Sequence, residues 1–302
     1  MNRSIEIVEV GPRDGLQNEA TLVSTADKVE LIRRAVGAGA RRIELTSFVN
    51  PRKVPQMADA EAVVAAFGAP EGVTRVGLVL NERGAERGLA SGLDELGAVA
   101  IASDAFGLRN QGQTSAESVE VAQRIIAKAL AAGKSAQATI AVSFGCPFSG
   151  EVDPAWVVEI ARELAAAGPR EIALADTIGV AVPAQVTALV KAVRAAIAPI
   201  PVRAHFHDTR NTGIANVWAA VEAGATTIDA AIGGLGGCPF APGASGNVAT
   251  EDVAYLLARS GIETGLNLDR LIGTTRWLGG LMNKPMPSML ARSGAFPVGD
   301  RA

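Results

Sequence analysis

Short apolar runs rich in β-branched residues alternate along this chain with longer alanine-rich segments whose apolar residues recur at helical spacing. The runs predict eight strands, at Ile5–Val10, Arg42–Leu45, Arg75–Leu80, Ala98–Ala102, Ala136–Val142, Glu171–Ala175, Val202–Phe206 and Thr227–Ile232. The alanine-rich segments predict helices at Thr25–Ala38, Asp59–Phe67, Ala85–Ser91, Ser115–Ala132, Asp153–Ala167, Pro183–Ile197, Ile214–Ala223 and Thr250–Ser260. Strand and helix therefore alternate through most of the chain.

Eight such units predict an α/β fold, a closed parallel (β/α)8 TIM barrel over residues 1–262, because buried parallel strands read as continuous apolar runs. An open doubly wound sheet is the alternative, and the absence of a GxGxxG sequence after the first strand argues against it. Residues 263–302 leave the pattern, with a helix expected at Leu268–Met282 and then a tail containing proline and glycine. We expect a C-terminal helical appendage that packs on the barrel, covers its mouth or contributes to a dimer.

Composition narrows the class of partner. The chain has 302 residues, 48% of them hydrophobic, and a net charge of −3 with scattered Lys and Arg. This pattern argues against a nucleic-acid or membrane partner and favours a small molecule. We also expect no targeting segment or membrane span. Cys146 and Cys238 have no CxxC spacing, which favours a reduced, cytoplasmic protein, and we expect Cys146 to be structural because it has no charged neighbour.

The two histidines of the chain, His205 and His207, stand two residues apart at the end of a predicted strand. Side chains at this spacing point to the same face, so both imidazoles can converge on one metal ion. A role as ordinary buried polar residues is the alternative. Because the chain has no other histidine, we favour a metal or catalytic role.

In a barrel of this kind the active site lies at the carboxyl ends of the strands, so polar residues there are candidates for function. They are Arg13, Asp14, Gln17, Glu44, Ser47, Asp176, Thr177, His205, His207, Cys238 and Asn247. Taken singly, several have ordinary explanations: Arg13 and Asp14 as a surface pair, Glu44 as a partner of Arg41 or Arg42, and Cys238 as a small buried residue. Their common placement at one rim favours function.

The chemistry of these groups suits a mixed oxygen and nitrogen site. Asp14, His205, His207 and Asn247 would hold Mg²⁺ or Mn²⁺, which can bind a substrate hydroxyl together with a neighbouring carbonyl oxygen. Arg13 is placed to stabilise an oxyanion, and the Cys238 thiol to transfer a proton. Together these groups suit the cleavage of a carbon–carbon bond through an enolate.

Four stretches of sequence resemble the 3-hydroxy-3-methylglutaryl-CoA (HMG-CoA) lyase family, over about Ile7 to Asn267. They are Val8–Glu19, Thr46–Val49 with Val54–Met57, Asp176–Val180, and Gly234–Phe240 with Gly243–Asn247. The glycine-rich signature around Cys238 is specific to the family. The Arg-Asp and His-x-His elements are shared with a wider superfamily of metal-dependent barrel lyases and synthases.

The resemblance implies cleavage of an acyl-CoA, HMG-CoA, to acetyl-CoA and acetoacetate. The C3 hydroxyl loses its proton, the C2–C3 bond breaks and the acetyl-CoA enolate is reprotonated. In the family, the residues matching Asp14, His205, His207 and Asn247 hold the cation, and the residue matching Arg13 steadies the enolate-side carbonyl. The match to Cys238 is the catalytic thiol on a mobile loop, whereas Glu44 and Asp176 match further acids. A homodimer is expected for this family, and whether leucine breakdown or another route uses the reaction stays open.

Arg210 departs from the family pattern, since better-known members have tyrosine there. With Gln17, Ser47 and Thr177 we assign it to substrate binding, and it raises the alternative of a different acyl group, such as citramalyl-CoA or a longer 3-hydroxy-3-alkylglutaryl-CoA. Ala20 also stands where some relatives have lysine. Two further alternatives are a metal hydrolase, which would need more histidines, and a catalytically silent acyl-CoA-binding protein.

Overall fold

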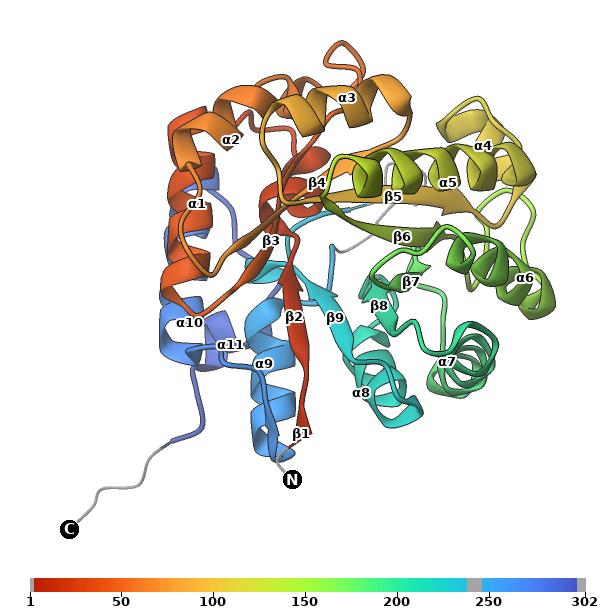
Figure 1. Cartoon of the computed structure of the whole chain (residues 1–302). Coiled ribbons are helices and arrows are strands. Elements are labelled where there is room, and N and C mark those ends of the chain that lie inside the picture. The colour runs from red at the N-terminus through yellow and green to blue at the C-terminus, as the bar shows by residue number, and fades with distance from the viewer. Residues whose placement is uncertain (1–2, 238–245, 298–302) are drawn as a thin grey trace.

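The predicted closed barrel is confirmed in the computed structural model, which describes residues 3–237 and 246–297. Eight parallel strands follow one another around the barrel in chain order, and the last pairs with the first, for example Val8 with Asp229 (Figure 1). The strands are β2 (Glu6–Glu9), β3 (Arg42–Ser47), β4 (Thr74–Val79), β5 (Glu95–Ile101), β6 (Ser135–Ala141), β7 (Ile172–Asp176), β8 (Val202–Phe206) and β9 (Thr227–Ala230).

Helices cover the outer face of the barrel, as the apolar faces of the alanine-rich segments predict (Figure 1). They are α1 (Thr25–Gly37), α2 (Ala60–Phe67), α3 (Glu82–Ala90), α4 (Asp104–Asn110), α5 (Ser115–Ala131), α6 (Pro154–Ala165), α7 (Pro183–Ile197), α8 (Gly213–Ala223) and α9 (Thr250–Arg259). Short helical turns η1 (Gly11–Gly15), η2 (Pro55–Met57) and η3 (Ile232–Gly234) lie in the connections. Side-chain caps fix several helix starts, such as Ser24 accepting from the Asp27 amide.

The largest error in the predicted strands concerns β5, which begins at Glu95 and not at Ala98. Glu95 is fully buried and forms an ion pair with the equally buried Arg42 of β3. Arg42 also lies 2.6 Å from Glu171. In the sequence, a charged residue beside an apolar run resembles a loop residue. Inside this barrel, however, the Glu95 charge is paired with Arg42.

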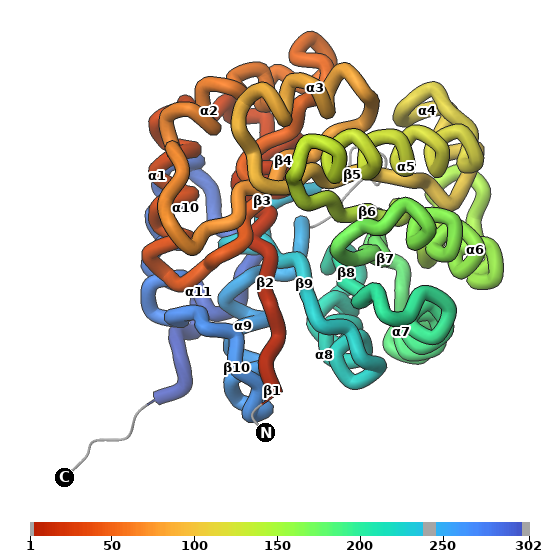
Figure 2. Tube along the Cα trace, in the orientation of Figure 1, coloured from red at the N-terminus to blue at the C-terminus, as the bar shows by residue number. Residues whose placement is uncertain are grey.

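The C-terminal appendage lies on the flank of the barrel. Helix α10 (Leu268–Met282), at the predicted position, packs beside α1, where the Arg270 guanidinium donates to the Gly37 carbonyl (2.6 Å). Helix α11 (Met289–Ser293) follows. A two-stranded pair of β1 (Arg3–Ser4) and β10 (Ile262–Glu263) joins the N-terminal segment to the end of α9 (Figure 2).

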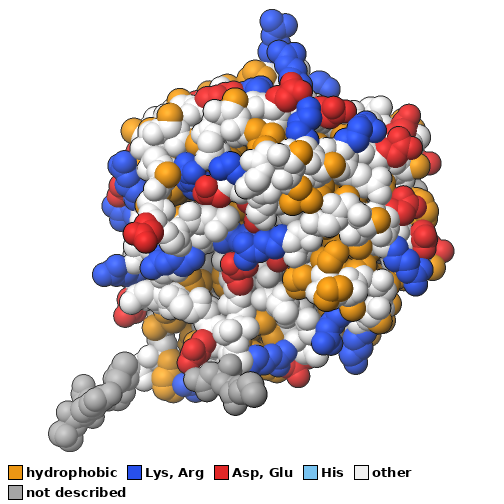
Figure 3. Space-filling view, viewed as in Figure 1, with side chains coloured by type: hydrophobic (Ala, Val, Ile, Leu, Met, Phe, Trp, Pro, Cys, Tyr) orange, Lys and Arg blue, Asp and Glu red, His pale blue; other side chains and the backbone are white. Residues whose placement is uncertain are grey.

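The surface drawn in Figure 3 carries Lys and Arg side chains interspersed with Asp and Glu side chains. One exposed ion pair joins Arg170 to Glu6, at 3.1 Å, and Glu6 also contacts the buried Arg42. Within residues 3–237 and 246–297, no helix has the length and apolar character needed to cross a membrane.

Candidate active site

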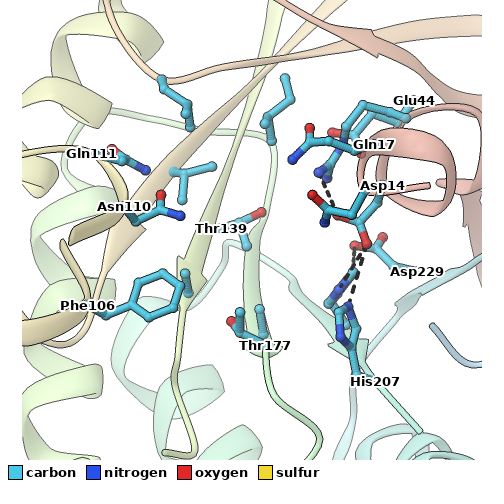
Figure 4. A pocket seen from close by; sticks show the side chains of 18 of the residues that line it. Asp14, Gln17, Glu44, Phe106, Asn110, Gln111, Thr139, Thr177, His207 and Asp229 are labelled. Atoms are coloured by element: carbon cyan, nitrogen blue, oxygen red, sulfur yellow. Dashed lines mark hydrogen bonds and ion pairs between the residues drawn. The ribbon is translucent and has the colours of Figure 1, made fainter. Parts of the chain in front are cut away.

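Most of the predicted rim residues line one pocket at the carboxyl ends of the strands (Figure 4). Arg13 and Asp14 lie on η1, a single π-helical turn directly after β2. Glu44 comes from β3 and His205 from β8, and His207 follows β8 by one residue. All five side chains line the pocket. The predicted placement of these residues at one rim is therefore correct.

Asp14 and the two histidines form a group that fits a metal ion. Asp14 Oδ2 lies 3.6 Å from His207 Nε2 and 3.9 Å from His205 Nε2. One potential ligand atom from each of the three residues lies within 4.8 Å of the others. Burial raises the pKa of Asp14, but Arg13 and the histidines outweigh this effect and hold the pKa well below its usual range. The carboxylate is therefore charged and ready to bind a cation.

Asn247 completes this group. It pairs with His207 in an isolated β-bridge, and its Nδ2 donates to Asp14 Oδ2 at 2.8 Å and to the Leu235 carbonyl at 3.0 Å. Its Oδ1 is buried without a hydrogen-bond partner among the described residues. A buried, unsatisfied amide oxygen beside a carboxylate and two imidazoles is a donor set that suits a divalent cation. The residues thus fit a divalent metal ion.

Asp229 and Arg203 support His205 from inside the barrel, and the sequence-based reasoning missed both. Asp229 Oδ2 lies 3.1 Å from His205 Nδ1, and Arg203 Nη1 lies 3.4 Å from Asp229 Oδ1. Burial raises the pKa of Asp229, but Arg203 and His205 outweigh it, so the group stays charged. The available signal was an aspartate inside the apolar strand Thr227–Ala230, at the inward register position beside His205.

Glu44 orients Arg13, and so neither Arg41 nor Arg42 is its partner. Glu44 Oε2 accepts from Arg13 Nε at 2.6 Å, and Arg13 Nη1 donates to Asp14 Oδ1 at the same distance. Burial lowers the pKa of Arg13, but the two carboxylates outweigh it and raise the pKa. The guanidinium therefore keeps its charge in a partly buried position at the pocket wall.

The pocket formed by the described residues has a volume of about 190 Å³, which is room for a small acyl group. Phe106, Asn110 and Gln111, from α4 and the residue after it, lie across the pocket from Asp14 and His207 (Figure 4). Helix α4 was not predicted, because its seven residues show too few apolar positions for a periodic pattern.

The residues assigned to substrate binding divide into two groups. Gln17 and Thr177 line the pocket, and Ser47 donates to Gln17 Oε1 at 3.3 Å. Arg210 is exposed, lies outside the pocket wall and donates to the carbonyls of Ile178 (3.0 Å) and Gly179 (2.9 Å). Its contacts therefore secure the loop after β7.

Asp176 also acts on this loop. Its two carboxylate oxygens accept the amides of Val180 (2.9 Å) and Ala181 (3.0 Å), and its side chain is not part of the pocket wall. Burial raises the pKa of Asp176. The predicted catalytic role of Asp176 stays a prediction. Its contacts hold the loop that begins with Thr177, a residue of the pocket wall.

The two cysteines differ in what the structure describes. Cys238, the predicted thiol, lies outside the described residues. Cys146 is buried and accepts a hydrogen bond from the Ser103 hydroxyl at 3.1 Å. Burial raises the pKa of Cys146, but bonds from Ser103 and Ser149 outweigh it and lower the pKa. The prediction for Cys146 considered charged neighbours only, whereas neighbouring hydroxyl groups lower its pKa.

Sequence and structure comparisons agree with this geometry. The sequence profile of the HMGL-like family matches residues 4–277. The chain is 42% identical over 301 residues to (R)-citramalyl-CoA lyase of Chloroflexus aurantiacus, covering 96% of this chain and 95% of that protein. It is 39% identical over 286 residues to a hydroxymethylglutaryl-CoA lyase of Bacillus subtilis, covering 95% and 96% of the two chains.

Solved structures give the same result. The Bacillus subtilis HMG-CoA lyase superposes with a TM-score of 0.92 at 38% identity, covering 96% of this chain and 98% of that one. An HMG-CoA lyase of Acinetobacter baumannii, in complex with coenzyme A and 3-methylmalate, gives 0.92 at 40% identity with 98% of each chain covered. The resemblance seen in the motifs is confirmed, and this chain belongs to the HMGL-like family.

Proposed function

We propose that this protein is a divalent-cation-dependent carbon–carbon lyase that cleaves HMG-CoA to acetyl-CoA and acetoacetate. The observation that carries the proposal is the convergence of Asp14, His205 and His207 beside the Arg13 guanidinium in one pocket. The small pocket volume suits the acyl group, with the coenzyme extending outward. Relatives of this chain at 38–42% identity carry the names of lyases of this type.

Asp14, His205, His207 and Asn247 would hold Mg²⁺ or Mn²⁺, which supplies Lewis-acid polarisation of substrate oxygens when bound. The chain's own groups do the rest. Two carboxylates fix the Arg13 guanidinium, so it presents a preorganised positive charge where an enolate oxygen develops. Donors fixed in this way need no reorganisation during the reaction.

Proton delivery to the enolate carbon is assigned to the Cys238 thiol, on the sequence motif alone. The described residues before it contact the segment that carries the candidate site. Asn18 donates to the Gly237 carbonyl at 2.8 Å, and so the residue before the cysteine is held against the segment that carries Arg13 and Asp14. Gly237, the residue before the cysteine, also lines the pocket.

A second substrate, citramalyl-CoA, is favoured by one specific observation. The (R)-citramalyl-CoA lyase is 42% identical to this chain, slightly above the 39% of the Bacillus subtilis HMG-CoA lyase. Both acyl groups carry a hydroxyl and a carboxylate, and the same cation site and Arg13 serve either one.

The test is turnover of both thioesters by the purified protein with Mn²⁺, with and without chelator, following acetyl-CoA and the second product. We expect chelator-sensitive release of acetoacetate from HMG-CoA. The ratio of kcat/KM values ranks the two substrates. Chelator-insensitive turnover, or cation binding without cleavage of either thioester, would overturn the proposal.

We further propose that the protein is a homodimer in the cytoplasm. The spacing of its cysteines, which suits a reducing compartment, supports the location. Light scattering of the purified protein tests the dimer, and an epitope-tagged protein followed by cell fractionation tests the compartment.

A further inference from the structure

The segment Lys284–Ser288, which joins α10 to α11, packs against the glycine turn η3 that follows the last strand of the barrel. We call this segment the strap. It leaves α10 through Asn283, which has a left-handed backbone (φ 49°), and it ends where Ser288 caps α11. Met286 and Ser288 are buried, although the strap belongs to the appendage and not to the barrel. Its buried side chains therefore pack against other parts of the chain.

The first contact is with the glycine turn at the base of the loop that leads to residue 238. The Ser288 amide donates to the Gly233 carbonyl at 3.2 Å, while the Gly233 amide donates to Glu251 at 3.1 Å. A Cβ added to Gly233 would lie 3.0 Å from the Met286 sulfur, and its φ of +77° also favours glycine. The strap thus fits closely against this turn.

The second contact is with the segment that follows η1. Lys284 Nζ lies 2.6 Å from both carboxylate oxygens of Glu19, which is 13% exposed. Asn18, the preceding residue, donates to the Gly237 carbonyl. The Lys284–Glu19 ion pair therefore holds the segment that carries Arg13 and Asp14. The same segment is hydrogen-bonded, through Asn18, to Gly237.

We propose that Lys284 and Ser288 are positioning residues for the lyase reaction: the strap sets the position of the segment that carries Arg13 and Asp14 and of the segment Gly233–Gly237. This inference rests on the proposed function. A strap that only stabilised the fold would affect unfolding, whereas one that positions these segments affects turnover at a constant fold.

The contacts predict how this effect divides between kinetic constants. The cation ligands His205 and His207 come from β8 and the residue after it, whereas Asp14 comes from the segment that the strap holds through Glu19. We therefore expect loss of a strap contact to lower kcat and to weaken cation affinity by a smaller factor, because the two histidines keep their positions. The segment that the strap holds carries the oxyanion donor, whose placement matters most in the transition state.

The central experiment uses Lys284→Met and Glu19→Gln, with the exposed α10 residue Arg276→Met as matched control. We expect each single variant to lower kcat about fivefold, because Arg13 and Asp14 lose part of their preorganised placement, and to lower Mn²⁺ affinity by a smaller factor. The charge-swapped double variant Glu19→Lys/Lys284→Glu should recover most of the lost kcat. Full kcat in the single variants, or equal loss in the control, would overturn the proposal.

A second arm separates the Ser288 backbone from its side chain. Ser288 has φ −48°, close to the angle of proline, so Ser288→Pro removes the amide donor to Gly233 with little backbone change. Ser288→Ala removes only the hydroxyl. We expect the proline variant to lose more kcat than the alanine variant at similar thermal stability, and equal kcat in the two variants would count against this contact.

Amide hydrogen exchange in the segment Leu16–Glu19 gives a readout that needs no turnover. Exchange there should become faster in Lys284→Met than in Arg276→Met. If wild type cleaves neither thioester while exchange behaves as expected, the proposed function fails and the strap contact stands. If wild type is active and exchange is unchanged by Lys284→Met, the strap proposal fails alone.

Discussion

Asp229 Oδ2 lies 3.1 Å from His205 Nδ1, whereas Nε2 of the same ring faces Asp14 at 3.9 Å. Because Asp229 is charged and can only accept, the form of the imidazole that has lost one proton keeps the other on Nδ1, and its Nε2 lone pair would be free for a cation. His207 lacks such support, since its buried Nδ1 has no partner among the described residues. The two histidines are therefore unequally prepared to bind a metal ion.

Asp229→Asn should weaken Mn²⁺ binding about tenfold to a hundredfold, as is typical when the group that orients a metal-bound histidine is lost. Calorimetric titration of the metal-free protein with Mn²⁺ measures this directly. Glu171→Gln is the control, because Glu171 lies on the far side of Arg203, 3.5 Å away, and does not touch His205. Equal loss of affinity in both variants would assign the effect to the ion-pair network as a whole.

His207→Ala should reduce Mn²⁺ affinity by at least about a hundredfold, because it removes one nitrogen ligand outright. The same titration measures the affinity. Trp156→Phe on α6, remote from Asp14, controls for general damage. Undiminished cation occupancy in His207→Ala would remove this residue from the ligand set.

Cys238→Ser should lower kcat at least about a hundredfold and leave Mn²⁺ affinity intact, as expected for loss of a proton-transferring group. Cys146→Ser is a matched control, because Cys146 is buried against Ser103, and its kcat should stay within about twofold of wild type. Steady-state kinetics and titration on both variants decide the point. Comparable losses in the two variants would contradict the assignment to Cys238.

The barrel was predictable because its parallel strands are buried on both faces and its helices are amphipathic, so both periods are visible in the sequence. The same alternation placed His205 and His207 on one face. Glu95 was placed outside its strand because its burial depends on Arg42, a partner 53 residues away. Long-range pairing of this kind leaves no local pattern.

Within the candidate site, residues in motifs were found and residues that support them were missed. Asp14 and Asn247 stand in recognisable stretches, whereas Asp229, Arg203 and Lys284 act through contacts that only the folded chain brings together. Arg210 was assigned to the substrate from its charge alone. Its hydrogen bonds to the backbone of the neighbouring loop could not be inferred without the register of β7 and β8.

Arg210→Tyr should change the preference between HMG-CoA and citramalyl-CoA by about threefold or more. The reason is indirect: Arg210 holds the carbonyls of Ile178 and Gly179, and Thr177, one residue earlier, lines the pocket. The ratio of kcat/KM values for the two thioesters measures the change. Arg210→Lys is a second variant, which keeps the positive charge but loses the planar guanidinium. Identical kcat/KM ratios in wild type, Arg210→Tyr and Arg210→Lys would exclude Arg210 from substrate selection.

Glu9 makes the stability of the protein depend on pH. It is fully buried beneath η1, where its Oε1 accepts from the amides of Gly11 (2.8 Å) and Ile232 (2.9 Å). Burial raises the pKa of Glu9 from 4.5 to about 7. Between these values the folded chain binds more protons than the unfolded chain, so the free energy of unfolding falls as pH rises.

Glu9→Gln removes this titration. Relative to wild type, its free energy of unfolding should therefore increase as pH rises from about 5 to about 8, by up to about 3 kcal/mol from the shift in pKa. Urea unfolding at several pH values measures the difference, and Glu71→Gln, at an exposed position, is the control. The side-chain amide in Glu9→Gln also has one acceptor oxygen fewer than the carboxylate, which changes the free energy of unfolding by an amount independent of pH. The test is therefore the slope of the free-energy difference against pH. A difference that stays constant over this range would mean that Glu9 keeps one protonation state throughout.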